Sequence, residues 1–468
     1  MSASPAASTP GPSIDIKAFI DTRPISSFQW FLVAMCFLVV VADGMDVAIM
    51  GFVASPIIDE WHITRPAFGL VMSAAPFGLA AGALLAGPSS DRFGRKPVLI
   101  VAILLFGLLT VAAAYASTPS EMAFLRFLAG MGLGAAMPNT TTLLSEYAPQ
   151  RRRSLMITIM FTGFNLGSAV IGLAAGNMIP HYGWRSVLLL GGIVPLLLVP
   201  VLVFALPESA RLLALRGTRP ARIGAILGRV TGHRFTGTET FVTNEPPLPA
   251  RTPIGTLFAS GFRATTVSLW VTYFMGLLVI YLLTGWLPTI MKDAGMSIDT
   301  ASYVTAGFQI GGTVGAVAVG WVMDRARPAL TIGVAYIGGA VFIFTLSQFG
   351  LVSREVAVLA TLVALAGFCM SGAQTGLNAY APGCYPTAAR ATGVSWMLGV
   401  GRLGSIVGSY VGGALLGLGW SFETIFALLA IPAFCAAIAI TATQVRGGGV
   451  VATVGRSALT RRGISDAT

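Results

Sequence analysis

The feature that most constrains this chain is a succession of apolar runs, each long enough to cross a lipid bilayer. A membrane-spanning helix needs about 20 mostly apolar residues, and twelve such runs follow one another along the 468 residues. Hydrophobic residues make up 55% of the sequence and charged residues only 10%, which excludes an ordinary soluble domain. The sequence therefore predicts an all-α membrane protein with twelve transmembrane helices.

Basic residues gather on one side of these runs. With both termini placed in the cytoplasm, 23 of the 29 Lys and Arg residues fall on the cytoplasmic side. This is the bias that orients membrane proteins. It accounts for the net charge of +11 without nucleic acid as a partner, and we expect a lipid bilayer to surround the chain instead.

An internal repeat divides the chain into two halves. The pattern G-xxx-DR at 87–92 recurs at 320–325, and P-xxx-R at 149–153 recurs at 386–390. The two offsets, 233 and 237 residues, nearly agree. Two pseudo-symmetric halves of six helices, in parallel orientation and joined by a linker, resemble the major facilitator fold of secondary transporters.

The one long hydrophilic connection carries eight arginines and lies between the halves. We expect it to form short amphipathic helices near the inner leaflet. The predicted segments are a cytoplasmic tail at 1–27, a first six-helix half at 28–206, a cytoplasmic linker at 207–263, a second six-helix half at 264–443 and a cytoplasmic tail at 444–468.

Two carboxylates interrupt the first apolar run, Phe28 to Phe52. Asp43 and Asp46 are three residues apart, so they project from nearly the same face of a helix. An ionisable side chain at that depth costs at least about 2.5 kcal/mol, so it normally faces protein or water and marks a functional site. Neighbouring carboxylates also disfavour each other's ionised forms, which suits proton binding and release. The alternative is a buried acid that is paired with an arginine and only holds helices together.

Arg126 lies in the fourth run at a depth close to that of Asp46. A rise of about 1.5 Å per residue places them within about one helical turn of each other, so a charge pair is geometrically allowed. Protonating Asp46 would abolish the attraction, and a pair that exists only without a bound proton can couple proton binding to a conformational change. A permanent structural ion pair is the alternative.

Arg402 is the only charged residue within the eleventh run and lies near mid-membrane. Because no acid accompanies it there, its anion must come from another helix or from a substrate. A guanidinium holds a carboxylate through two parallel hydrogen bonds, so Arg402 is a candidate for binding a substrate carboxylate, with an ion pair to Asp43 or Asp46 as the alternative. Its repeat mate, Asn165, is a candidate cavity-lining residue.

Other polar and aromatic side chains of the inner helices are candidates for contacting a substrate ring and its hydroxyl. Most aromatic residues in such helices only pack or mark the membrane interface. The candidates are Tyr273, Tyr281, Gln374, Asn378 and Trp396.

A tight turn, GPSSDRFGRK at 87–96, separates the second and third runs. Glycine permits the bend, and the charges can contact helix ends; Glu146, at the inner end of the fourth run, is a candidate partner. Contacts of this kind would hold the inner ends of the bundle shut and break on opening, whereas the alternative is a pure topology signal. The predicted gating residues are Gly87, Asp91, Arg92, Gly94, Arg95, Glu146, Asp324, Arg325 and Arg390.

On these motifs the chain resembles one branch of the major facilitator superfamily, the aromatic acid:proton symporter family, which includes 4-hydroxybenzoate, benzoate and hydroxyphenylpropionate permeases. The resemblance rests on ADGMDVAIMGF at 42–52, MFTGFNLGS at 160–168 and TGWLPTIMKDAGMS at 284–297. The second-half turn, DRARP at 324–328, departs from the first because it lacks the glycine and the second basic pair, so we expect asymmetric gating. The resemblance implies functional importance for Asp43, Gly44, Asp46, Asp91, Arg126, Glu146, Asp324, Arg390 and Arg402.

The resemblance implies a monomeric, proton-coupled symporter of the bacterial inner membrane that imports aromatic carboxylates. The proton gradient would drive it, and no cofactor or metal is expected. The alternatives are a porter for other organic acids or an exporter of the same fold. The sequence shows no cluster of His, Cys and carboxylates of the kind that a membrane-embedded enzyme needs, and nothing beyond the linker and tails is available as the signalling domain of a receptor.

Overall fold

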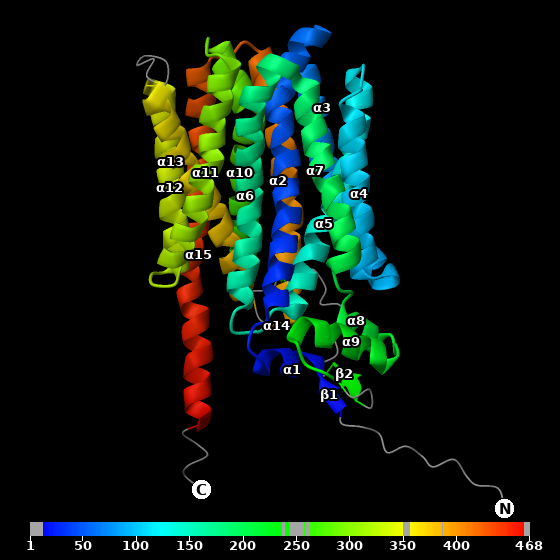
Figure 1. Ribbon diagram of the computed structural model, residues 1–468. Coiled ribbons are helices and arrows are strands. Elements are labelled where there is room, and N and C mark those ends of the chain that lie inside the picture. Colours follow the sequence, from blue (N-terminus) through cyan, green and yellow to red (C-terminus); the bar gives the residue numbers. More distant parts are fainter. Residues whose placement is uncertain are drawn as a thin grey trace, which may run out of the picture.

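In the computed structural model, the chain forms a bundle of long helices that run roughly along one axis (Figure 1). The structure describes residues 13–235, 239–243, 257–258, 262–349, 356–385 and 387–462. The first half contains α2 (Ser27–Trp61), α3 (Arg65–Phe93), α4 (Arg95–Ala113), α5 (Pro119–Tyr147), α6 (Arg153–Tyr182) and α7 (Trp184–Ala205). The second half contains α10 (Arg263–Asp293), α11 (Ile298–Met323), α12 (Pro328–Phe349), α13 (Val356–Tyr380), α14 (Thr387–Gly417) and α15 (Phe422–Arg462).

Ten of these twelve helices are long and apolar enough to cross a membrane by themselves. The other two are α5 and α14, the helices that carry Arg126 and Arg402. Each packs against other helices, α5 on α3 and α4 and α14 on α10 and α3. Polar residues are tolerated in such helices because they face protein instead of lipid.

The two halves repeat the same helix packing. α2 packs on α6 as α10 packs on α14, α3 on α5 as α11 on α13, and α4 on α7 as α12 on α15. A Cβ atom at Gly167 would lie 2.0 Å from the carbonyl oxygen of Val41, and one at Gly404 would lie 2.2 Å from that of Phe274. Only glycine permits so close a helix contact, which explains why the sequence repeats it at both places.

The halves are bonded to each other at one end of the bundle, which we call the far end. Arg65 of α3 pairs with Asp293 of α10 at 2.7 Å, and Lys292 of α10 pairs with Asp59 of α2 at 2.5 Å. At the opposite end, we find no ion pair between the halves within the described ranges. The bundle is therefore held closed at the far end.

A small platform covers the first half at the opposite end, which we call the linker end (Figure 1). It consists of β1 (Ser13–Asp15), α1 (Ile16–Thr22), α8 (Ala210–Leu215), α9 (Pro220–Thr231) and β2 (Thr240–Val242). The strands pair in parallel and tie the N-terminal segment to the linker. Strands of three residues carry too little period-two signal for sequence to predict them.

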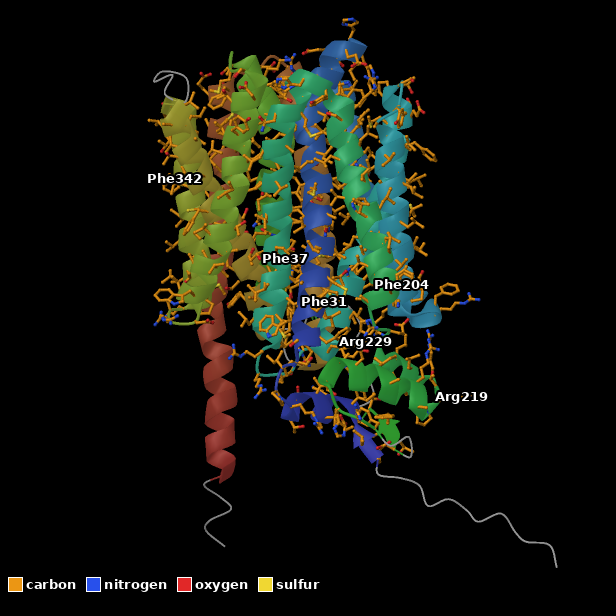
Figure 2. The ribbon with its side chains drawn as sticks, viewed as in Figure 1. Phe31, Phe37, Phe204, Arg219, Arg229 and Phe342 are labelled. Atoms are coloured by element: carbon orange, nitrogen blue, oxygen red, sulfur yellow. The ribbon has the colours of Figure 1, made fainter. Side chains whose placement is uncertain are left out.

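The linker contains the short amphipathic helices that the sequence predicts. α9 buries Ile223 and Leu227, whereas Arg219, at its N-cap, and Arg229 are exposed (Figure 2). The guanidinium of Arg229 lies 4.9 Å from the centroid of the Phe28 ring at the start of α2. The linker therefore rests on the first half through α9.

Two helices extend beyond the apolar runs that predict them. α2 continues past Phe52 to Trp61 and ends where His62 adopts a positive φ of 51°. α15 runs on past residue 443, where the sequence predicts a tail, and leaves the bundle at the linker end (Figure 1). An apolar run marks the part of a helix that suits the bilayer and does not fix the helix ends.

Candidate functional site

A buried ion pair joins α2, α4 and α5. Nη1 and Nη2 of Arg126 donate to Oδ1 and Oδ2 of Asp46, each at 2.7 Å, and the hydroxyl of Thr110 donates to Oδ1 of Asp46 at 2.9 Å. Arg126 and Asp46 are both 0% exposed. Two parallel charge-assisted bonds fix both groups, so the charge of Asp46 is balanced inside the first half.

A cavity of about 30 Å³ borders this pair where the two halves meet. It is large enough for a water molecule and far smaller than the cavities that admit a benzene ring. Its lining includes Asp46 and Arg126 from the first half and Tyr281, Thr284 and Ser409 from the second. The pair is therefore next to a space for water, and this cavity as it stands is too small for an aromatic ring.

Arg402, in the middle of α14, is half-buried and forms no salt bridge within the described ranges. Its Nη1 donates to the hydroxyl of Tyr281 on α10 at 3.3 Å. It is the charge that acts most strongly on Asp43 of α2, ahead of Asp46. Asp43 is buried, and its Oδ1 accepts no hydrogen bond from the described residues. The two opposite charges interact without being joined, so both keep unused hydrogen-bonding capacity.

Polar side chains continue from Arg402 toward the linker end. Tyr273 of α10 interacts with Arg402 and with Gln374 and Asn378 of α13. Gln374 is 7% exposed, whereas Asn378, one turn nearer the linker end, is exposed. Access to this polar region therefore increases toward the end of the bundle at which the halves are not bonded.

Comparison with known proteins identifies the family. Residues 36–352 and 269–453 match the Major Facilitator Superfamily. The chain belongs to this superfamily. A gallate transporter of Pseudomonas putida is 55% identical over 429 residues, which cover 92% of this chain and 95% of the relative. The 4-hydroxybenzoate transporter PcaK of Pseudomonas aeruginosa is 48% identical over 428 residues, which cover 91% and 95%.

A solved structure shows the same fold. The inward open conformation of the xylose transporter XylE from E. coli superposes with a TM-score of 0.70 at 18% identity, covering 88% of this chain and 95% of that chain. Together with the transporters among its relatives, this likeness makes the chain a multi-pass membrane transporter and not an enzyme. Among the residues described, no group of three or more His, Cys, Asp or Glu side chains is placed to hold a metal ion.

The structure places Asn165 and Trp396 in different surroundings. Asn165 is buried, and its amide lies against Gly312 of α11, at the boundary of the halves. Trp396 is 40% exposed and stacks on Trp270, with the ring centroids 5.8 Å apart. Six residues separate Trp396 from Arg402, so the two project from different faces of α14. The structure does not bring Trp396 to Arg402.

The turn between α3 and α4 is held by acids from two other segments. Nε of Arg95 pairs with Oε1 of Glu146 at 3.3 Å. A second acid, Glu208, accepts two backbone hydrogen bonds through its Oε1, from the N–H groups of Arg95 and Lys96 at 3.0 and 3.3 Å. These N–H groups begin α4, and the N-terminus of a helix favours a negative charge. Gly94 has a φ of 108°, and a Cβ there would lie 2.4 Å from Oε2 of Glu208, so this position requires glycine.

Sequence reasoning assigned Glu146 to this turn and missed Glu208 and Ser209. The hydroxyl of Ser209 donates to Oε2 of Glu146, which ties the end of α5 to the start of the linker. Both missed residues stand directly after the sixth apolar run. An acid at that place, on the same side as a basic turn, is the signal that predicts such a contact.

The matching turn of the second half has no comparable contact among the described residues. Asp324 and Arg325 are exposed, and Arg325 donates to the carbonyl of Trp321 in its own helix at 3.0 Å. Arg92 of the first turn is also exposed. The surroundings of Gly87 and the side chains of Asp91 and Arg390 lie outside the described part of the structure.

The ion pairs at the far end were also missed. Asp59 and Asp293 lie near the ends of α2 and α10, the first long helix of each half. Their offset of 234 residues matches the repeat, and each acid pairs with a base of the other half, Lys292 or Arg65. Acids at repeat-related positions in the predicted outer loops are the sequence signal for this contact.

Proposed function

We propose that the protein is a proton-coupled symporter that imports aromatic carboxylates such as 4-hydroxybenzoate, benzoate or hydroxyphenylpropionate across the bacterial inner membrane. The observation that carries the proposal is Arg402, a mid-membrane guanidinium beside the Tyr281 hydroxyl without a salt bridge to any described residue. A charge at that depth is a functional site by default, and a substrate carboxylate would complete its bonds. The gallate and 4-hydroxybenzoate transporters among the relatives support this substrate class.

We assign the coupled proton to Asp43. Ionised Asp43 and a substrate carboxylate are both attracted to Arg402, so they compete for it. A proton on Asp43 removes the competitor, and substrate and proton then favour each other's binding, as symport requires. Asp46 is a poorer carrier because protonating it would disrupt its two bonds to Arg126; we propose that this pair holds the first half together beside the water-sized cavity.

The orientation follows from the same proposal. With the linker end in the cytoplasm and both chain termini on that side, the far-end ion pairs would close the transporter to the outside, and the substrate would reach Arg402 from the inside. The turn between α3 and α4, held by Glu146 and Glu208, would move with the first half when the transporter opens to the other side. One chain contains the whole site, so a monomer is sufficient.

Uptake of labelled 4-hydroxybenzoate into proteoliposomes tests the proposal. With an alkaline interior we expect accumulation above the external concentration, and a protonophore should reduce uptake to equilibration. Unlabelled benzoate should compete, whereas succinate should not. Equal competition by succinate would favour a porter for other organic acids, and net efflux under the same gradient would favour an exporter.

A further inference from the structure

A polar cluster between α10, α12 and α13 lies beside Arg402 and has one group without a partner. The hydroxyl of Tyr336 on α12 donates to Oε1 of Gln374 on α13 at 2.7 Å. Tyr336 is fully buried and Gln374 nearly so. This bond orients the amide so that Nε2 of Gln374 lies near the Tyr273 hydroxyl, but Nε2 makes no well-formed hydrogen bond with that hydroxyl or with any other described residue. A buried N–H group without an acceptor is costly, so its presence points to a bound partner.

Two glycines show that the cluster is built into the helix packing. A Cβ at Gly276 of α10 would lie 2.3 Å from Oε1 of Gln374 and 2.6 Å from the hydroxyl of Tyr336. A Cβ at Gly401 of α14 would lie 1.9 Å from Cδ1 of Tyr273. The Tyr273 ring therefore packs on the backbone of α14 one residue before Arg402.

The Tyr273 ring also gives a measure of the distance between the Arg402 region of α14 and Gln374. One edge of the ring lies against α14 beside Arg402, and the hydroxyl interacts with Gln374 and Asn378. A tyrosine side chain is a 4-substituted phenol, as is 4-hydroxybenzoate. An aromatic acid in offset contact with this ring, with its carboxylate on Arg402, would bring a hydroxyl at its 4-position to Gln374.

We propose that Nε2 of Gln374, oriented by Tyr336, donates to the hydroxyl oxygen at the 4-position of the substrate ring and so selects 4-hydroxylated aromatic acids. The inference rests on the proposed function, because it takes Arg402 as the site of the carboxylate. Benzoate would leave Nε2 without an acceptor, and sites that hydrogen-bond a substrate hydroxyl reject analogues that lack it. Gln374 is thus a specificity-determining residue.

Competition for uptake into proteoliposomes of the full chain tests this. In the wild type, 4-hydroxybenzoate should compete at a concentration at least about tenfold lower than benzoate or 3-hydroxybenzoate. Gln374→Leu should raise the KM for 4-hydroxybenzoate at least about tenfold and change the inhibition constant of benzoate less than about twofold. Tyr336→Phe should cause a smaller loss of the same preference, and it keeps the test valid if Gln374→Leu fails to fold.

Gln309→Leu is the matched control. Gln309 of α11 is a buried glutamine whose Nε2 donates to the hydroxyl of Thr284 at 3.1 Å, outside the cluster, so the preference should survive this change. Arg402→Gln should weaken both acids equally. If Gln374→Leu and Tyr336→Phe weaken both acids equally, or neither, the specificity role is wrong while the role of Arg402 stands. If the wild type takes up neither acid, the proposed function itself fails.

Discussion

The two halves share their helix packing but use their buried arginines differently. In the first half, Arg126 is inaccessible to solvent and holds both oxygens of Asp46. In the second, Arg402 is half-buried, bonds to the Tyr281 hydroxyl and forms no salt bridge with the described residues. One arginine is satisfied by its own half, and the other keeps capacity for an anion. The repeat therefore preserves helix contacts, while the charges within it diverge in function.

The two turns at the linker end also differ: Arg95 of the first turn is paired, and the charges of the second turn are exposed. Between α3 and α4, carboxylates of Glu146 and Glu208 hold the side chain of Arg95 and the first backbone N–H groups of α4. Between α11 and α12, Asp324 and Arg325 are exposed. The first half is thus fixed to the linker and platform, and the second half is freer to move against it.

The largest expected effect concerns the pair in the first half. Arg126→Gln leaves Asp46 buried without its counter-ion, which should lower the free energy of unfolding by about 3–5 kcal/mol, measured by thermal unfolding in detergent. Adding Asp46→Asn should recover most of the loss. If Arg126→Gln instead keeps its stability and loses only proton-driven uptake, the pair is a coupling switch and not a structural pair.

Arg402→Gln should have the opposite effect to Arg126→Gln: it should impair transport and leave stability nearly unchanged. Removing the carboxylate-binding group should lower kcat/KM for 4-hydroxybenzoate about a hundredfold, equivalent to about 2.7 kcal/mol, with little change in thermal stability. The kcat/KM of Arg402→Lys should lie between those of the wild type and Arg402→Gln, because an ammonium keeps the positive charge but lacks the planar fork of a guanidinium. A large loss of stability in Arg402→Gln would remove the contrast between the two arginines.

The two turns give a smaller contrast. Glu208→Gln weakens a charge-assisted cap and should lower the free energy of unfolding by about 1 kcal/mol and the uptake rate by up to about fivefold. Asp324→Asn, its counterpart in the second half, should lower the free energy of unfolding by less than Glu208→Gln does, and should change the uptake rate less than about twofold. Equal effects of both variants would show that the second turn also makes essential contacts.

The smallest effect is expected at the far end. Lys292→Gln removes one of two partly exposed ion pairs, each contributing about 1 kcal/mol or less. It should shift the population toward states open at the far end by up to about fivefold, measured as the labelling rate of a cysteine introduced at Met50, which lines the cavity beside Asp46. Asp299→Asn, at a partly exposed acid near the same end, is the control, and equal labelling in both variants would exclude a closing role for the pair.

Much of the fold follows from the sequence because bilayer-length apolar runs and repeated glycine motifs are strong local signals. The similar depths of Asp46 and Arg126 showed that the pair was geometrically allowed, and the structure shows it formed. Depth does not give the rotation of a helix, however, so sequence could not decide whether Asp43 or Asp46 interacts more closely with Arg402. It also grouped Trp396 with the binding residues although it projects from another face of α14.

The contacts that sequence missed join segments far apart in the chain. Glu208 reaches the start of α4 across more than a hundred residues, and the pair of Arg65 with Asp293 spans both halves. Their charges are visible in the sequence, but partner choice depends on how the helices meet. The orphan amide of Gln374 is likewise apparent only once Tyr336 is placed beside it.

The most direct test of the central claim is gradient-driven uptake by Asp43→Asn proteoliposomes, measured with counterflow exchange of 4-hydroxybenzoate in the same preparation. Because the variant keeps Arg402 and removes only the proton carrier, we expect exchange near the wild-type rate and the same internal concentration with and without a pH gradient. Accumulation that still follows the gradient, as in the wild type, would contradict the assignment of the proton to Asp43.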